Sequence, residues 1–232
     1  RSKYLLINLN INTTIITHLG MTGKFLVSKN NKKKKTSFYY EIKKSDNKHN
    51  HVIFELNKKT KLIYNDVRKF GFIELKPTNK IINVSYLKKL GPEPLSEKFN
   101  FTYFKKTIKN KKRSLKNLLM DQSFVSGLGN IYVNEVLFIT KLNPKKNINK
   151  INDIKIKNLI YSIKDILKNS IKKGGSSIQN FNNTKGQSGS FQQNFYVYAR
   201  EGKNCLQNNC NDKIKRIIIS NRSTFYCKTC QK

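Results

Sequence analysis

Long apolar runs and acidic residues are the two features that this 232-residue sequence most lacks. No run reaches the roughly eighteen apolar residues of a membrane-spanning helix, so the sequence predicts none. Hydrophobic residues make up 37% of the chain, which is low for a globular protein but enough for a buried core. The length leaves room for two modest domains, or for one large domain with a small appendage.

The scarcity of acidic residues gives the chain an extreme charge. Only 13 Asp and Glu oppose 47 Lys and Arg, for a formal net charge of +34. An AT-rich genome explains why only six of the 47 are arginine. It does not explain the few acidic residues, because Asp and Glu codons are equally compatible with AT-rich DNA. The balance favours a surface that binds a polyanion, most simply a phosphate backbone contacted without regard to base sequence.

The first part of the chain has the short apolar runs that are typical of β-strands. Residues 29–35 are polar and rich in lysine, which predicts a solvated loop, and residues 57–60 predict a hairpin turn. Short strands at this spacing predict a β-sandwich or barrel. Strands are expected at residues 3–9, 13–19, 38–42, 51–56, 61–65 and 70–75.

The second part of the chain has helical periodicity. It follows a stiff linker with two prolines, residues 91–95. Apolar residues between Ile154 and Ile171 recur with the spacing of one long amphipathic helix, which stops near Gly174 and Gly175. Residues 176–194 are rich in Ser, Gly, Asn and Gln and predict a mobile loop. Shorter helices are expected at residues 101–109, 114–121 and 130–140.

The four cysteines all lie in the last 28 residues, as two close pairs: Cys205 with Cys210, and Cys227 with Cys230. Zn²⁺ accepts four thiolates in a tetrahedron and then has no open position, so the spacing predicts one structural zinc ion. So short a segment cannot bury a core alone, and the metal would supply its folding energy. Two disulfides or free thiols are the alternatives.

Several segments, in order over nearly the whole chain, resemble the formamidopyrimidine-DNA glycosylases. The motifs include Tyr64-Asn65-Asp66-Val67-Arg68-Lys69-Phe70-Gly71 and Gly127-Leu128-Gly129-Asn130-Ile131-Tyr132. Further matching segments are residues 1–6, 18–23, 48–52, 90–95, 119–135, 197–202 and 222–227.

This resemblance implies an α+β fold in three parts. They are an incomplete N-terminal β-sandwich over residues 1–91, a helical helix-two-turn-helix domain over residues 92–200, and a zinc finger over residues 201–232. It also implies a monomeric base-excision-repair enzyme of the bacterial cytoplasm, which acts on double-stranded DNA with oxidised bases or abasic sites.

The resemblance further implies a bifunctional glycosylase and lyase that removes 8-oxoguanine and formamidopyrimidines. An N-terminal proline, followed by a glutamate, would attack C1′ of a nucleotide turned out of the duplex and form a Schiff base. Elimination would then cut the strand on both sides. No residue here matches that proline or that glutamate, so we expect the family's chain to start several dozen residues before Arg1. The chain as it stands is expected to bind DNA without excising a base.

Individual roles also follow from the resemblance. Lys3 and Arg222 match catalytic positions, Lys3 assisting elimination and Arg222 binding phosphate and taking part in the second elimination. Glu135 resembles a buried structural carboxylate, and Asn130 is of a residue type that caps a helix. The DNA-binding positions are Met21, Arg68 and Phe70, which would enter the duplex, together with His49, Lys111, Lys116, Asn130 and Arg222.

The sequence departs from the family's pattern at several places. The first cysteine pair is separated by four residues instead of two, and Val67, Lys69 and Ala199 replace residues that are common in the family. Two other functions stay open. One is an endonuclease VIII-like glycosylase for oxidised pyrimidines, and the other is a zinc protein that binds nucleic acid without catalysis.

Overall fold

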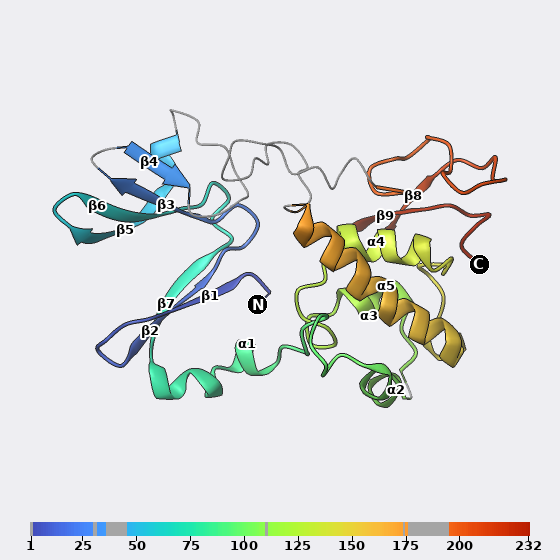
Figure 1. The fold of residues 1–232 in the computed structure, drawn as a ribbon, viewed down its shortest axis with the longest axis horizontal. Coiled ribbons are helices and arrows are strands. Elements are labelled where there is room, and N and C mark those ends of the chain that lie inside the picture. The colour runs from blue at the N-terminus through green and yellow to red at the C-terminus, as the bar shows by residue number, and fades with distance from the viewer. Residues whose placement is uncertain (1, 30–31, 36–45, 110, 174, 176–194) are drawn as a thin grey trace. The chain divides into compact units, whose positions relative to one another are not determined.

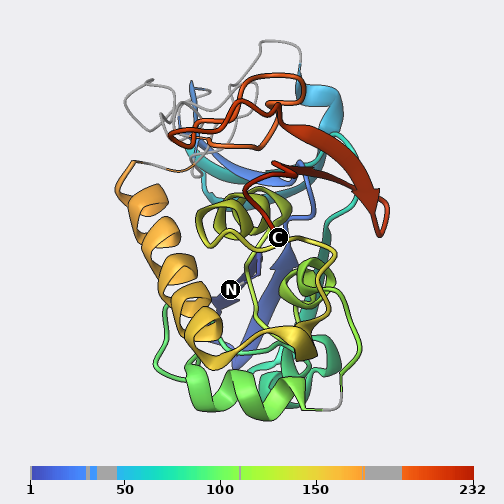
Figure 2. The same cartoon turned by 90° about the vertical axis from the view of Figure 1, so that its right-hand side faces the viewer.

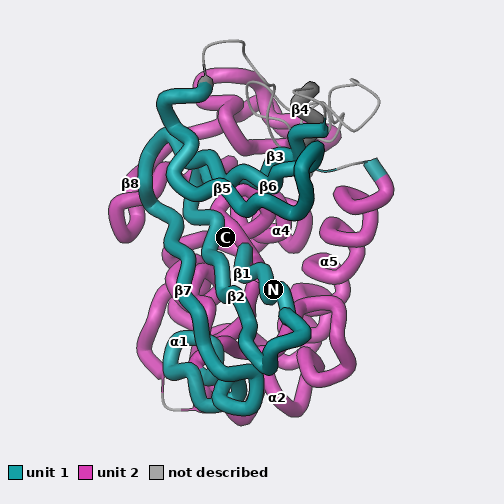
Figure 3. Tube along the Cα trace, turned by 90° about the vertical axis from the view of Figure 1, so that its left-hand side faces the viewer, with its two compact units in different colours: residues 1, 3–88, 173–192 teal, residues 2, 89–172, 193–232 magenta. Residues whose placement is uncertain are grey.

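The computed structural model describes residues 2–29, 32–35, 46–109, 111–173, 175 and 195–232 (Figure 1). Most of these residues fall into two compact units, which are coloured separately in Figure 3. We call residues 3–88 the β unit, and residues 89–172 with 195–232 the helical unit. No helix in the described part of the chain is long and apolar enough to cross a membrane. The division into three domains with the predicted boundaries stays a prediction.

The β unit contains two antiparallel sheets. Its buried core includes Ile16, Phe25, Leu26, Ile63 and Tyr64, all at most 5% exposed. The first sheet has the order β1 (Tyr4–Asn8), β2 (Thr13–His18) and β7 (Phe72–Pro77). The second has the order β4 (Lys32–Lys35), β3 (Lys24–Lys29), β6 (Thr60–Asn65) and β5 (Asn50–Asn57).

The prediction of a loop at residues 29–35 is wrong for the part that the structure describes. Residues Lys32–Lys35 form β4 and pair with β3, in the register Leu26 to Lys35. An edge strand needs only main-chain partners on one side, and lysines on such a strand are a common protection against further pairing. A strand made of lysines has no alternation of apolar and polar residues, so the sequence pattern did not predict β4. The turn between β5 and β6 is confirmed, whereas residues 38–42 lie outside the described part of the chain.

Short helical elements connect or follow the strands of the β unit. Within the β unit they are the 3₁₀ turns η1 (Asp46–His49) and η2 (Thr78–Asn83) and the helix α1 (Ser85–Lys88), none of which was expected. The helical unit contains α2 (Phe101–Ile108), α3 (Leu115–Met120), α4 (Asn130–Ile139), η3 (Ile148–Lys150) and α5 (Asp153–Lys172) (Figure 2).

Side-chain caps set the starts of α2 and α3, among others. Asn100 accepts a hydrogen bond from the Tyr103 amide at 2.9 Å, and Ser114 accepts one from the Asn117 amide at 3.3 Å. The expected cap at Asn130 is wrong. Gly129 is the N-cap of α4, and Asn130 is the first helical residue, which turns its side chain to other partners.

The apolar stripe of α5 is confirmed, although its buried part is shorter than expected. Ile156, Leu159, Ile160, Ile163 and Ile166 are buried, while Ile154 and Ile171 near its two ends are mostly exposed. Residues 176–194 lie outside the described part of the chain, so the loop expected there stays a prediction.

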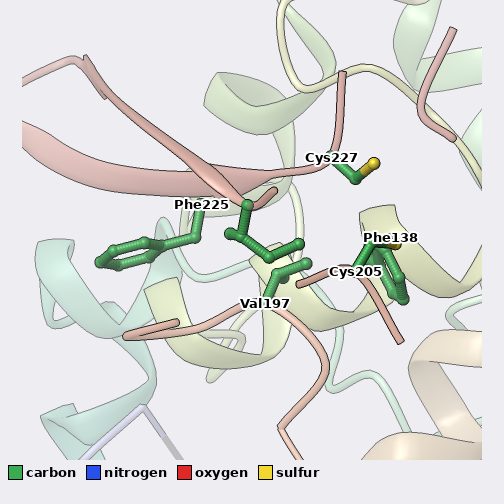
Figure 4. Close-up of a cluster of buried hydrophobic side chains, with 6 residues drawn as sticks. Phe138, Val197, Cys205, Phe225 and Cys227 are labelled. Atoms are coloured by element: carbon green, nitrogen blue, oxygen red, sulfur yellow. The ribbon is translucent and has the colours of Figure 1, made fainter. Parts of the chain in front are cut away.

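The chain ends in a hairpin of β8 (Lys215–Ile219) and β9 (Arg222–Tyr226), which packs against α4 within the helical unit (Figure 2). A small apolar cluster lies below it and includes two of the cysteines (Figure 4). Its buried members are Phe138, Val197, Cys205, Ile214, Phe225 and Cys227. Together with the two units, this hairpin confirms the α+β fold class.

Candidate nucleic-acid interface and metal centre

Met21, Arg68 and Phe70 form one exposed cluster on two loops of the β unit. A guanidinium N–H of Arg68 lies 3.2 Å from the Met21 sulfur, and the guanidinium carbon lies 4.5 Å from the centre of the Phe70 ring. Both apolar members are largely exposed, Met21 by 55% and Phe70 by 57%. Exposed side chains of this size, bracketing a cation, present two apolar faces and a hydrogen-bond donor to whatever binds there.

Close backbone contact holds the two loops together. Gly20 has a φ of +55°, and a Cβ at this position would lie 2.6 Å from the carbonyl carbon of Phe70. At Gly71 a Cβ would lie 2.0 Å from the hydroxyl oxygen of Tyr64. Both positions therefore require glycine, the first also because its backbone is left-handed. Lys69, between Arg68 and Phe70, itself has a φ of +56°.

Lys3 lies beside this cluster. Its φ is +66°, and its Nζ donates a 2.7 Å hydrogen bond to the carbonyl oxygen of Gly20, the residue before Met21. His49 lies at the end of η1 and is half-buried, and its carbonyl oxygen accepts from the Asp66 amide at 3.0 Å. The structure thus brings Lys3 to the predicted duplex-entering residues. The roles of Lys3 and His49 stay predictions.

A hollow of about 360 Å³ lies in the helical unit between α3 and the β8–β9 hairpin. Arg222, the first residue of β9, is exposed on its wall. Ser220 at the tip of the hairpin donates a 2.9 Å hydrogen bond to Asn117 on α3. The lining residues are Arg113, Lys116, Asn117, Met120, Asp121, Ile219, Ser220 and Arg222.

Lys116 is 1% exposed, which differs from the surface cation that the sequence suggested. Its Nζ donates to Oγ1 of Thr224 at 2.6 Å and to the carbonyl oxygen of Ser223 at 3.1 Å. Burial, and to a lesser degree the nearby charge of Arg222, lowers the pKa of Lys116 to about 8. The ammonium is therefore bonded within the protein, and its contact with DNA stays a prediction.

Asn130 contributes to the same corner of the helical unit. Its Nδ2 donates to the carbonyl oxygen of Ser223 at 3.0 Å, so that Ser223 accepts from both Lys116 and Asn130. Lys111 is half-buried in the connection between α2 and α3, and its amide bonds the carbonyl oxygen of Ile108 at 3.0 Å. The proposed DNA contacts of Asn130 and Lys111 are not tested by these bonds.

Six of the residues that line the hollow were not among the predicted site residues, Arg113 and Asn117 among them. Arg113 pairs with Asp121 at 2.6 Å and keeps 49% of its side chain exposed. Lys116, Asn117 and Met120 have the spacing of one helix face, and Ser114, which follows Arg113, is a residue type that begins a helix. This helical spacing in the sequence could have indicated that Asn117 lies on the same face as Lys116.

Glu135 is a buried carboxylate, as the resemblance suggested. It is 1% exposed and accepts from the amides of Tyr196, Val197 and Tyr198 at 2.7, 3.0 and 2.8 Å. Burial raises its pKa, although the three amides oppose that effect. Glu135 thereby ties α4 to the segment that leads into the cysteine region.

The four cysteine sulfurs converge on one point. All lie within 4.8 Å of one another, and the distances Cys205–Cys230 and Cys210–Cys227 are both 3.7 Å. All four are free thiols, and 3.7 Å is far longer than a disulfide bond of about 2.05 Å. A tetrahedron with Zn–S bonds of about 2.3 Å has sulfur–sulfur edges of about 3.8 Å. The donor set and its spacing therefore fit a four-thiolate metal site, and the longer first cysteine spacing does not prevent convergence.

The sequence was compared with models of protein families and with known proteins. Residues 1–73 match the model of the formamidopyrimidine-DNA glycosylase N-terminal domain, and residues 90–182 match that of the formamidopyrimidine-DNA glycosylase H2TH domain. The formamidopyrimidine-DNA glycosylase of Rickettsia bellii (strain OSU 85-389) is 43% identical over 232 residues, which is 100% of this chain and 80% of that protein. The one from Roseobacter denitrificans is 39% identical and 81% covered, again over the whole of this chain.

Solved structures of this family share the fold. The Lactococcus lactis Fpg in complex with an abasic-site DNA has a TM-score of 0.82 and 34% identity, over 100% of this chain and 80% of that one. The same protein with a FAPY-dG DNA has a TM-score of 0.81 at the same identity and the same two coverages. By sequence and by structure, the chain belongs to the formamidopyrimidine-DNA glycosylase family.

Proposed function

We propose that this protein is a base-excision-repair DNA glycosylase for oxidised purines, with lyase activity at the abasic site that excision leaves. The observation that carries the proposal is the exposed cluster of Met21, Arg68 and Phe70. Isolated apolar side chains on a surface need no explanation, but two that bracket an arginine on adjoining loops suit entry into a base stack. Family membership and the two Lactococcus lactis complexes with damaged DNA support it.

In this proposal the cluster occupies the gap that a departing nucleotide leaves. The thioether of Met21 and the ring of Phe70 replace lost stacking, while the guanidinium of Arg68 bonds the base that has lost its partner. Both apolar side chains are already exposed, so the protein need not unfold a core to present them. In the same proposal Lys3, whose Nζ bonds the carbonyl oxygen of Gly20 beside the cluster, contacts the phosphate near the lesion and assists elimination.

The helical unit would hold the DNA backbone. Arg222 and Arg113 line the same hollow, and a guanidinium matches the oxygens of a phosphate with two parallel hydrogen bonds. Asn130 lies at the N-terminus of α4, where free amides favour an anion. The charge of +34 supports backbone binding over a wide surface.

The metal proposed for the cysteine site is a single Zn²⁺ ion. Four thiolates leave the ion no open position, so its contribution when bound is folding energy and not catalysis. Cys205 and Cys227 lie in the apolar cluster below the hairpin, which ties the metal site to the only core that this segment possesses among the described residues. The hairpin that carries Arg222 would then depend on the ion for its position.

The excision chemistry implied by the resemblance uses a secondary amine as nucleophile. It attacks C1′, the damaged base leaves, and the Schiff base that forms undergoes elimination. None of residues 1–232 matches that proline, so we propose that these residues alone bind lesion DNA without excising the base.

Borohydride trapping tests the proposal. The full product of the gene is incubated with duplexes carrying 8-oxoguanine, formamidopyrimidine or thymine glycol, with reduction of any Schiff base. A covalent adduct with the oxidised purines supports the proposal, and a preference for thymine glycol would favour the endonuclease VIII-like alternative. If no oxidised base yields an adduct, a binding protein without catalysis replaces the enzyme. Residues 1–232 alone serve as the matched control.

A further inference from the structure

Asp66 is a buried acidic side chain between the two loops that carry Met21, Arg68 and Phe70. Its residue is 1% exposed, in a protein where only 13 residues are acidic. A carboxylate so placed costs folding free energy unless donors compensate for its lost hydration. The groups that donate hydrogen bonds to Asp66 therefore indicate the role of this buried charge.

Four neutral donors satisfy the two oxygens of Asp66. Oδ1 accepts from the hydroxyl of Thr22 and from the amide of Arg68, the latter at 3.3 Å. Oδ2 accepts from the amide of Gly71 at 2.8 Å and from the hydroxyl of Tyr64 at 3.3 Å. Burial by itself would raise the pKa of Asp66, but these hydrogen bonds outweigh it and leave the pKa below its ordinary value.

Three of these bonds end on the duplex-entering residues or beside them. Thr22 follows Met21, Gly71 follows Phe70, and the Arg68 amide is bonded directly. The Arg68 amide also donates to Oγ1 of Thr22 at 3.0 Å, which closes a ring of bonds across the two loops.

The fourth bond joins this arrangement to the core of the β unit. Tyr64 is 4% exposed and lies on β6, and burial together with the charge and hydrogen bond of Asp66 raises its pKa to about 12. The tyrosine hydroxyl is therefore a donor at all ordinary pH values. It fixes the carboxylate against a buried strand residue of the β unit.

We infer that Asp66 is a positioning residue for lesion recognition: its carboxylate sets the spacing of Met21, Arg68 and Phe70, so that the three enter a duplex as one unit. The inference rests on the proposed function, because it concerns the same three residues. A buried carboxylate that only stabilised the fold would affect binding to damaged and undamaged DNA alike. A positioning role affects only the binding that needs the three side chains.

The test compares two duplexes of one sequence, with and without a tetrahydrofuran abasic-site analogue, using the whole chain. Asp66→Asn keeps the size of the side chain but turns an amide donor toward one of the N–H groups. Thr22→Val removes a single hydroxyl and keeps the carboxylate, should the first variant fold poorly. Glu74→Gln is the matched control, since Glu74 on β7 of the same unit also accepts from a tyrosine hydroxyl, that of Tyr86, at 2.6 Å.

We expect Asp66→Asn to weaken binding to the abasic-site duplex about tenfold, the effect of one lost hydrogen bond to a charged group. Binding to the undamaged duplex should stay within about twofold, because phosphate contacts dominate it. Thr22→Val should show a smaller loss of the same kind, and Glu74→Gln none. A 2-aminopurine placed opposite the abasic site should stay brighter with Asp66→Asn, because the gap is then filled less completely.

Two results would overturn the inference while the proposed function stands. One is undiminished lesion preference in both Asp66→Asn and Thr22→Val. The other is an equal loss on both duplexes, which would mean that Asp66 supports only the fold. If the unaltered chain itself showed no preference for the abasic-site duplex, the proposed function would fail and this inference with it.

Discussion

Lys116 reaches from α3 to the β8–β9 hairpin and places its Nζ 2.6 Å from the hydroxyl oxygen of Thr224. The same ammonium bonds the carbonyl oxygen of Ser223, so a buried charge joins the helix to the residue that follows Arg222. The hollow that Arg222 lines thus owes its shape partly to Lys116. A phosphate bound there would meet a hairpin whose position is already set.

Replacement of Lys116 by methionine is expected to destabilise the helical unit. The variant removes the donor of the buried Thr224 hydroxyl, while the Ser223 carbonyl keeps its bond from Asn130, and we expect a cost of about 1–3 kcal/mol. Urea unfolding of the unaltered chain and of Lys116→Met measures the difference, with the exposed Lys58→Met as control. Equal stability of Lys116→Met and the unaltered chain would show that the two bonds contribute nothing.

The stability contributed by Lys116 should rise between about pH 8 and pH 10.5. In the folded state its pKa is about 8, below the ordinary 10.5, so the unfolded chain binds this proton more tightly. In that window the unfolded state holds more protons, and a rise in pH then favours folding. The free energy of unfolding of the unaltered chain minus that of Lys116→Met, measured across the window, isolates this group. A flat difference contradicts the depressed pKa.

Arg68→Ala should lower lesion preference without lowering stability. The side chain lies on the surface between Met21 and Phe70, and surface substitutions usually change stability by about 0.5 kcal/mol or less. We expect thermal unfolding within that range and a loss of preference for abasic-site over undamaged DNA. Lys58→Ala, which removes one charge from the β5–β6 turn, is the control for charge alone. The same loss in both variants would refute a specific role for Arg68.

Removal of the metal should disorder the hairpin that carries Arg222. The apolar cluster below it is small, so we expect the segment to need the free energy of metal binding to stay folded. Metal analysis should find one zinc per chain. A strong chelator, or Cys227→Ser, should open the region of β8 and β9 to proteolysis while the β unit stays protected. Unchanged protection after complete removal of zinc would contradict this.

Affinity for undamaged DNA should fall steeply as salt concentration rises. Each phosphate that a lysine or arginine neutralises releases condensed counterions, so the logarithm of the affinity falls linearly with the logarithm of salt concentration. Titrations from low to physiological salt give the slope. A shallow slope would mean that the charge of +34 reflects codon bias and not a binding surface.

Several features could be predicted from the sequence because they depend on neighbours along the chain. The cysteine pairs place their sulfurs by local turns, and the convergence of all four follows once a hairpin joins the pairs. The buried stripe of α5 follows from helical periodicity. The strand Lys32–Lys35 could not be predicted, because its pairing uses main-chain groups and its lysines carry no apolar pattern.

By itself the sequence determined the family, the α+β class, the helical periodicity and a four-thiolate site, since ordered motifs and residue spacing carry all of these. Only the tertiary structure decided which charged groups are buried and what they bond. Lys116 meets partners more than a hundred positions away, and Asp66 meets Thr22 across 44 positions. Whether a charge is solvated or enclosed depends on what packs over it, and that is a property of the folded chain, not of its order of residues.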